Sequence, residues 1–434
     1  MPLWFQLSLV DESLEQVQRS LNWIVQNAPH DKRQLMQLYA VLGWPQLRAV
    51  GSLPCGAGAW QTTLDLAEEL DDQDYRLRAL WALWVDRSNH GEPHAALALA
   101  ERFAAVAAEA GDPADLCLAD RMRARSLHFI GDQDGALQSV AKMLDHYVPP
   151  RTRSHTTRFQ YDQKITGRIT LARALWVRGF PEQALRVTEE NVTEALALGH
   201  VLTLTHALSD GGCPIALHVG DLGLADRYTA MLHRYTTDHA LDVWRTYADG
   251  FRGQIMIRED AFIRGDEFRA GMAKLHAALD MLERGGFVLL RVPFLSALAE
   301  AFLTDGRHAA ALATVDRALG HCEAAGERWA LAELYRVRGE ILLAESKAGA
   351  AANAERQFRL AVTVSRQQKA LSWEIRAATS LARLLLRQGK ADDSRDVLAP
   401  VLDMFTEGHA LPDLKAADEL LRQATSPDQS RAAE

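Results

Sequence analysis

Cysteine, lysine and long apolar runs are scarce in this sequence of 434 residues. The cysteines are far apart and form no CxxC pair, which argues against a disulfide framework or a zinc site. We therefore expect buried free thiols in a reducing cytoplasm. No run of about 18 apolar residues occurs. The apolar N-terminus also lacks a basic leader, so neither a transmembrane helix nor a signal peptide is expected.

Positive charge is also in short supply. The formal net charge is −9, and only eight of the 48 basic residues are lysine, so that the other 40 are arginine. A general DNA- or RNA-binding protein carries a basic surplus, and direct nucleic-acid binding is therefore not expected. The arginines instead supply rigid bidentate donors for carboxylate or phosphate groups.

The usual signatures of catalysis and metal binding are missing. The sequence has no Walker A stretch (GxxxxGK[ST]) and no HExxH, and its 15 histidines show no metal-ligand spacing. The segment GDQDG at 131–135 lacks the later acidic ligands of a calcium loop. We therefore expect no cofactor, no metal site and no enzymatic activity. A catalytic triad assembled only by the fold would leave no such local signature.

Strand patterns are nearly absent, whereas helical patterns recur along the chain. Ala, Leu, Arg and Glu recur at spacings of three and four, which is typical of amphipathic helices. Glycines follow these helical segments at intervals of 40–48 residues: Gly91, Gly131, Gly179, Gly220, Gly265, Gly306, Gly349 and Gly389. A period near 40 predicts an array of helix pairs rather than separate globular domains.

A tighter register recurs inside four of the repeats. A small residue lies seven positions before the glycine and another lies five positions after it: Ala124 and Ala136, Ala172 and Ala184, Ala299 and Ala311, Ala382 and Ser394. This spacing resembles the tetratricopeptide (TPR) pattern, in which small residues let the two helices of a pair cross closely. Three other sets are looser, with Trp84, Cys213 and Arg258 at the first small position.

The predicted architecture is an all-α superhelix of about nine TPR-like helix pairs. Residues 1–70 are expected to form irregular helix pairs, and residues 71–408 the TPR-like repeat array. Residues 409–424 are expected to form a capping helix, and the polar residues 425–434 a disordered tail.

Six segments resemble the C-terminal region of large bacterial signal-transduction ATPases of the STAND type. They are RSHTTRFQYDQ, RGFPEQALR, CPIALHVGDLGLADRY, GERWALAELYRVRGEILL, LSWEIRAATSLARLLLRQGK and LAPVLDMFTEGHALPDLKAADELL. Such proteins carry an N-terminal winged-helix or adenylate cyclase domain, then a nucleotide-binding module, then a TPR-like (MalT-like) arm. The resemblance extends over essentially the whole chain. Its most specific part is Phe405-Thr406-Glu407-Gly408 followed by Pro412-Asp413-Leu414.

This resemblance implies a sensor and assembly arm of a cytoplasmic transcriptional or signalling regulator, without catalytic residues. Because the sequence has no Walker A stretch, it is not itself the ATPase. It is either the arm of a longer regulator or a free-standing relative.

The repeat register also predicts which side chains line the concave groove, because the first helix of each TPR-like pair faces it. These residues are Arg121, Arg125, His128, Arg173, Trp176, Asp210, Arg252, Glu259, Glu300, Glu333, Arg336, Glu340, Arg376 and Arg383. Arg158, which opens a helix after Pro149-Pro150, is a further candidate for the rim of the site. Helix capping is the alternative role for Arg158.

We expect these charged side chains to bind a peptide, a segment of a protein partner or a small anionic ligand in the concave groove. The alternative is that they are ordinary charges on a solvated face, some of them paired with each other. An occupied groove would favour one curvature of the array and so act on attached output domains. The alternative function is a purely structural protein–protein scaffold without ligand sensing. The sequence is also compatible with an oligomer.

Overall fold

The computed structural model describes residues 10–28, 30–43, 56–148, 158–261, 263–345 and 347–425. It confirms the predicted all-α superhelix of paired helices, and no strand occurs within these ranges. Cys55 and residues 426–434 of the expected tail lie outside them. No helix in the described ranges is long and apolar enough to cross a membrane.

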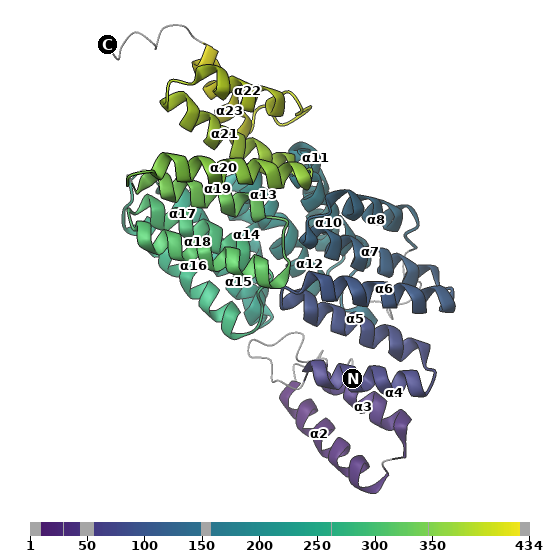
Figure 1. Ribbon diagram of the computed structural model, residues 1–434. Coiled ribbons are helices and arrows are strands. Elements are labelled where there is room, and N and C mark those ends of the chain that lie inside the picture. The colour runs from purple at the N-terminus through teal and green to yellow at the C-terminus, as the bar shows by residue number, and fades with distance from the viewer. Residues whose placement is uncertain are drawn as a thin grey trace.

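In these ranges the helices form nine successive pairs (Figure 1). The first helices of the pairs are α3 (Lys32–Gly43), α5 (Gln73–Asn89), α7 (Pro113–Ile130), α10 (Gln163–Val177), the composite α12 (Val201–His206), η2 (Ala207–Gly212) and α13 (Cys213–Val219), α15 (Asp242–Glu259), α17 (Arg291–Thr304), α19 (Leu331–Ala344) and α21 (Leu371–Arg387). The second helices are α4 (Gly56–Glu69), α6 (Pro93–Ala110), α8 (Gln133–Asp145), α11 (Pro181–Ala197), α14 (Leu222–Asp238), α16 (Asp266–Arg284), α18 (His308–Ala325), α20 (Ala350–Gln367) and α22 (Ala391–Leu402). The helix α2 (Val10–Asn27) precedes them, and α23 (Pro412–Thr425) packs on α21 and α22.

Local signals explain where the helices begin and end. The carboxylate of Asp112 accepts a hydrogen bond from the amide of Ala114 at 2.9 Å and caps the start of α7. That helix ends at Gly131, whose φ of 97° is a left-handed conformation that glycine adopts without steric cost. Asp132 then caps α8 through the amide of Gly135. The chain therefore reverses in only two residues between α7 and α8.

The small residues predicted for the helix crossings are all buried. Ser394 also donates a hydrogen bond from its Oγ to the carbonyl oxygen of Ala382 at 3.0 Å, which joins α21 and α22 at their crossing. The first and second helices of a pair can approach this closely because no large side chain lies between them.

The predicted register is wrong in α15. Gly265 does not end this helix in a left-handed turn; it has a φ of −78° and stands at the start of α16. The helix ends at Glu259, and a longer connection follows. Its close crossing lies at Gly253, where an added Cβ would come within 2.7 Å of the carbonyl oxygen of Gly271 on α16. The small position of this repeat is therefore Gly253, not Arg258.

The superhelix closes on itself, so that repeats far apart in sequence lie side by side. Figure 1 shows α5 to α11 beside the later repeats, and direct bonds join the two halves. The amide of Val288 donates to the carbonyl oxygen of Asn89, and the amide of Arg328 to that of Phe129, both at 2.8 Å. Ser372 donates from its Oγ to the carbonyl oxygen of Trp176 at 2.5 Å. The first helices of both halves consequently face a shared interior.

Candidate functional site

Within the described residues, the shared interior contains two small cavities and a wider groove, and one of the cavities, of about 60 Å³, adjoins the groove. The inner cavity has a volume of about 70 Å³ and lies between α5, α7, η2 and α15, with Trp84, Arg121 and Tyr247 in its wall. The groove has a volume of about 310 Å³ and lies between α13, α15, α17, α19, α21 and α23. A buried polar network and a cluster of aromatic rings separate the inner cavity from the groove.

The buried network gathers four residues that the sequence predicted for the groove. The Asp210 carboxylate pairs with the guanidinium of Arg125 and, at 2.8 Å, with that of Arg173. The Nε of Arg173 donates to the Nε2 of His128 at 3.1 Å, while the Nδ1 of His128 lies 2.8 Å from the Oε1 of Gln133. Because Nε2 accepts, the proton of the neutral ring is on Nδ1 and is donated to Gln133. These side chains are buried rather than open to the groove, and the Nη2 of Arg173 is left without a hydrogen-bond partner.

Electrostatics fix the protonation of this network. Burial alone would raise the pKa of Asp210, but the adjacent Arg125 and Arg173 hold that pKa well below its usual value. Burial, reinforced by Arg173, lowers the pKa of His128 to about 3. Asp210 lies in the π-helical segment η2, whose wider turn is a feature common at functional sites.

Arg121 differs from its neighbours because it has no acidic partner. Only 3% of this residue is exposed, and its guanidinium lies 4.8 Å from the ring centroid of Trp84. No hydrogen bond or ion pair joins it to another residue in the described part of the chain, and its Nε is buried without a partner. Burial, with a contribution from Arg125, lowers the pKa of Arg121 to about 9. The inner cavity is therefore bordered by an uncompensated cation.

Aromatic rings form the wall between the network and the groove. Trp176 stacks on His218 with a centroid distance of 4.2 Å, and Trp373 meets Trp176 edge to face at 4.6 Å. The guanidinium of Arg376 lies 5.4 Å from the Trp176 ring. Trp176 was predicted to line the groove, and the structure buries it in this wall.

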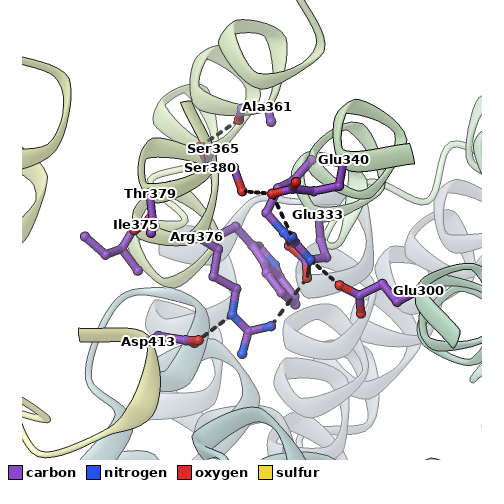
Figure 2. Close-up of polar contacts among 12 residues, drawn as sticks. Glu300, Glu333, Glu340, Ala361, Ser365, Ile375, Arg376, Thr379, Ser380 and Asp413 are labelled. Atoms are coloured by element: carbon purple, nitrogen blue, oxygen red, sulfur yellow. Dashed lines mark hydrogen bonds and ion pairs between the residues drawn. The ribbon is translucent and has the colours of Figure 1, made fainter. Parts of the chain in front are cut away.

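Ion pairs line the groove on its α17 and α19 side. Arg336 pairs through Nη2 with Glu300 at 2.6 Å and through Nε with Glu333 at 2.7 Å. Figure 2 shows Glu300, Glu333 and Glu340 converging on this place from two helices. The sequence predicted all four of these residues for the groove, and the structure brings them together.

The opposite side of the groove is built by α21 and α23. Arg376 pairs through Nε with Asp413 at 2.6 Å and donates through Nη2 to the carbonyl oxygen of His218 at 3.1 Å (Figure 2). The Oγ of Ser380 donates to Glu340 at 2.6 Å, and Arg383 reaches the same carboxylate only at 3.7 Å. Arg383 therefore keeps much of its charge directed to solvent.

Sequence reasoning missed several groove residues, among them Asp413, Ser380 and Arg258. The exposed side chain of Arg258 on α15 lines the groove and donates through Nη1 to the carbonyl oxygen of Leu217 at 2.6 Å. No ion pair to it occurs among the described residues. The correct register of α15, with Gly253 at the crossing, would have identified it: Gln254 and Arg258 face the interior one turn apart.

Three predicted residues lie outside the inner cavity, the groove, and the network and aromatic wall between them. Arg252 pairs with Asp226 of α14, and Glu259 is exposed at the end of α15. Both were predicted from the incorrect register of that helix. Arg158 pairs with Asp74 at 2.8 Å and with Asp115 at 3.2 Å, and so joins the segment that follows α8 to α5 and α7.

Comparison with known proteins finds only distant structural similarity. No family model matches this chain, and no curated protein matches it. Among solved structures, a Rap protein complexed with competence and sporulation factor has 15% identity and a TM-score of 0.46, over 71% of this chain and 87% of that one. Yeast Tom70 has 10% identity and a TM-score of 0.39, and the match covers 97% of this chain and 87% of that one. The P58(IPK) TPR domain has 14% identity and a TM-score of 0.23, and the match covers 90% of this chain and 99% of that one. Similarities this distant carry no argument about function.

Proposed function

We propose that this chain is a non-enzymatic interaction arm whose groove binds an extended segment of a protein partner. The observation that carries the proposal is an open groove with partly exposed charges of both signs. Arg258, Glu300 and Arg383 project into it from three different first helices. An extended peptide, which offers carbonyl and amide groups together with charged side chains, matches such a mixed surface.

The ion pairs behind these charges favour binding by reducing its entropic cost. Arg336 and Arg376 are held from several sides, so the carboxylates around them are fixed before a partner arrives. Pre-oriented groups lose less side-chain entropy on binding than free ones do. The partly exposed Arg383, which lies 3.7 Å from Glu340, then supplies an adjustable contact.

We further propose that the arm belongs to a cytoplasmic signal-transduction regulator of the ATPase type resembled by its sequence. The segments that carry the resemblance also supply most of the groove. GERWALAELYRVRGEILL contains Glu333 and Arg336, and LSWEIRAATSLARLLLRQGK contains Arg376 and Arg383. Partner binding in the groove would favour one arrangement of the helices that line it and transmit that preference to an attached domain.

Panning a phage-displayed library of random peptides against the immobilised chain tests the groove. We expect enriched peptides to bind the double variant Arg258→Gln/Arg383→Gln about tenfold or more weakly, because two charge-assisted contacts are lost. Arg252→Gln, which removes the same charge outside the groove, is the matched control and should bind as the parent does.

Peptides that bind the double variant and the parent equally would place recognition outside the groove. A chain that enriches no peptide but forms a fixed complex with a folded protein would favour the purely structural scaffold instead.

A further inference from the structure

We propose that the inner cavity binds a small organic carboxylate, with the carboxylate on Arg121 and the apolar body against Trp84, Trp244 and Tyr247. This site is separate from the groove, because the two are lined by different charged residues. The proposal therefore does not depend on partner binding in the groove.

The first argument is the charge of the cavity. Arg121 is almost fully buried and has no acidic partner, whereas the nearby Asp210 is already shared by Arg125 and Arg173. A buried cation without a partner is costly, and its contact with Trp84 offsets only part of that cost. The planar guanidinium offers two parallel N–H donors, which fit the two oxygens of a carboxylate.

The second argument is the size and lining of the cavity. A space of about 70 Å³ holds several waters or a small organic molecule. Its walls include the large rings of Trp81, Trp84, Trp244 and Tyr247, which favour an apolar or aromatic body over a bare inorganic anion. Its dimensions exclude an extended peptide.

The third argument is the position of the cavity at the seam between the two halves. Its wall includes Asn89 of α5 and the segment 287–290 that precedes α17. The amide of Val288 donates to the carbonyl oxygen of Asn89 at 2.8 Å beside it. A ligand here contacts both halves of the superhelix, so its binding favours the closed form.

The proposal is tested with the purified full chain and matched pairs of acid and amide. The probes are benzoate with benzamide, phenylacetate with phenylacetamide, and butyrate with butyramide, together with inorganic phosphate. We expect at least one acid to raise the midpoint of thermal unfolding, and to bind roughly tenfold to hundredfold more tightly than its amide by calorimetry. Phosphate should give no comparable effect.

The variant Arg121→Met separates ligand binding from a structural role. We expect it to lose the acid-dependent shift and, without any probe, to unfold at the same or a higher temperature, because an uncompensated buried charge has been removed. Arg123→Met is the control on the same helix, since Arg123 pairs with Glu101 near the surface, and it should keep the shift. Arg121→Lys, which retains the charge but not the planar pair of donors, should fold and bind more weakly.

Several results would overturn the proposal. The probes would do so if no acid raised the unfolding midpoint, if an acid and its amide bound equally, or if phosphate had an equal effect. The variant Arg121→Met would do so if it kept the acid-dependent shift of the midpoint, or if it were markedly less stable than the parent without any probe.

Discussion

At the scale of single residues, the interior depends on histidines that stay neutral. His128 accepts from Arg173, and His206 lies against Tyr161 with the rings tilted and a centroid distance of 4.8 Å. Burial lowers the pKa of both histidines to about 3, and that of His218 well below its ordinary value. The surrounding arginines disfavour any further positive charge here.

Stability should therefore fall as the solution becomes acidic. Unfolded histidines take up protons below a pH of about 6.5. In the folded protein, His128 and His206 do not do so until about pH 3. Between these values the unfolded state binds more protons, and each such histidine reduces the free energy of unfolding by about 1.4 kcal/mol per pH unit. Asp210, whose pKa is lowered, loses its stabilising effect only below its ordinary pKa. The loss of stability just below about pH 6.5 is therefore due to the histidines. Thermal unfolding midpoints recorded between about pH 4.5 and pH 7.5 measure the slope.

The variant His206→Phe, which preserves a ring beside Tyr161, should reduce this dependence by about the contribution of one histidine. His276→Gln, at an exposed position on α16, should leave it unchanged. An identical pH dependence in His206→Phe and the parent would contradict this explanation.

At the scale of the helix, the crossing of α15 and α16 requires a glycine on each helix. Gly253 and Gly271 face each other backbone to backbone, with no room for a side chain on either. This contact positions the face of α15 that carries Tyr247, Gln254 and Arg258 toward the interior. A shift of α15 relative to α16 would therefore change both the cavity and the groove.

Gly253→Ala is expected to destabilise the protein by about 1–3 kcal/mol, because the new Cβ would lie 2.7 Å from the Gly271 carbonyl oxygen and the helices must separate. Gly320→Ala, inside α18 with open space around it, is the matched control. It should stabilise by about 0.5–1 kcal/mol through helix propensity. Denaturant unfolding of the two variants beside the parent measures both effects, and equal stability of Gly253→Ala and the parent would refute the close crossing.

At the scale of the whole molecule, the last repeat supplies the cap of a helix in the first half. Phe180, the residue just before α11, makes no side-chain cap. The Glu407 carboxylate instead accepts from the amide of Gln183 at 2.9 Å and from its Nε2 at 3.0 Å. In return, Glu182 accepts from the amide of Gly408 at 2.9 Å. An acidic group at a helix N-terminus is stabilised by the free amides and the helix dipole there.

Glu407→Ala should loosen this closure without unfolding the repeats. We expect the Gln183 amide to exchange its hydrogen about tenfold or more faster, because its charge-assisted acceptor is lost. Hydrogen exchange followed by mass spectrometry measures it. Asp403→Ala, an exposed acidic residue at the end of α22, is the control and should leave that exchange unchanged. Unaltered exchange in Glu407→Ala would show that the contact does not hold the halves together.

The sequence predicted the helix pairs because their signals are local. A left-handed glycine, an aspartate cap and small residues at a fixed spacing act within one repeat, as Gly131, Asp132 and Ala124 illustrate. The register failed in α15 because that helix ends several residues before Gly265, and this put Arg252 and Glu259 in place of the interior residues of α15.

The closure of the superhelix had no such local signal. Ser372 and Trp176 are 196 residues apart, and Gln183 and Glu407 are 224 residues apart. Spacing within one repeat predicted that Arg125, Arg173 and Asp210 face inward, but not that later repeats would cover them. Within a single repeat, the spacing of residues is the same whether the concave face is open to solvent or covered by later repeats.

The hydrogen bonds between residues that are far apart in the sequence can form only after the later residue has been synthesised. A ribosome adds roughly 5–20 residues per second, so the helix α11 waits on the order of 10–40 s for the carboxylate that caps it. During that interval the uncovered arginines and tryptophans of the first half meet water or a chaperone. In a nascent chain that stalls before α21, these arginine and tryptophan side chains stay uncovered.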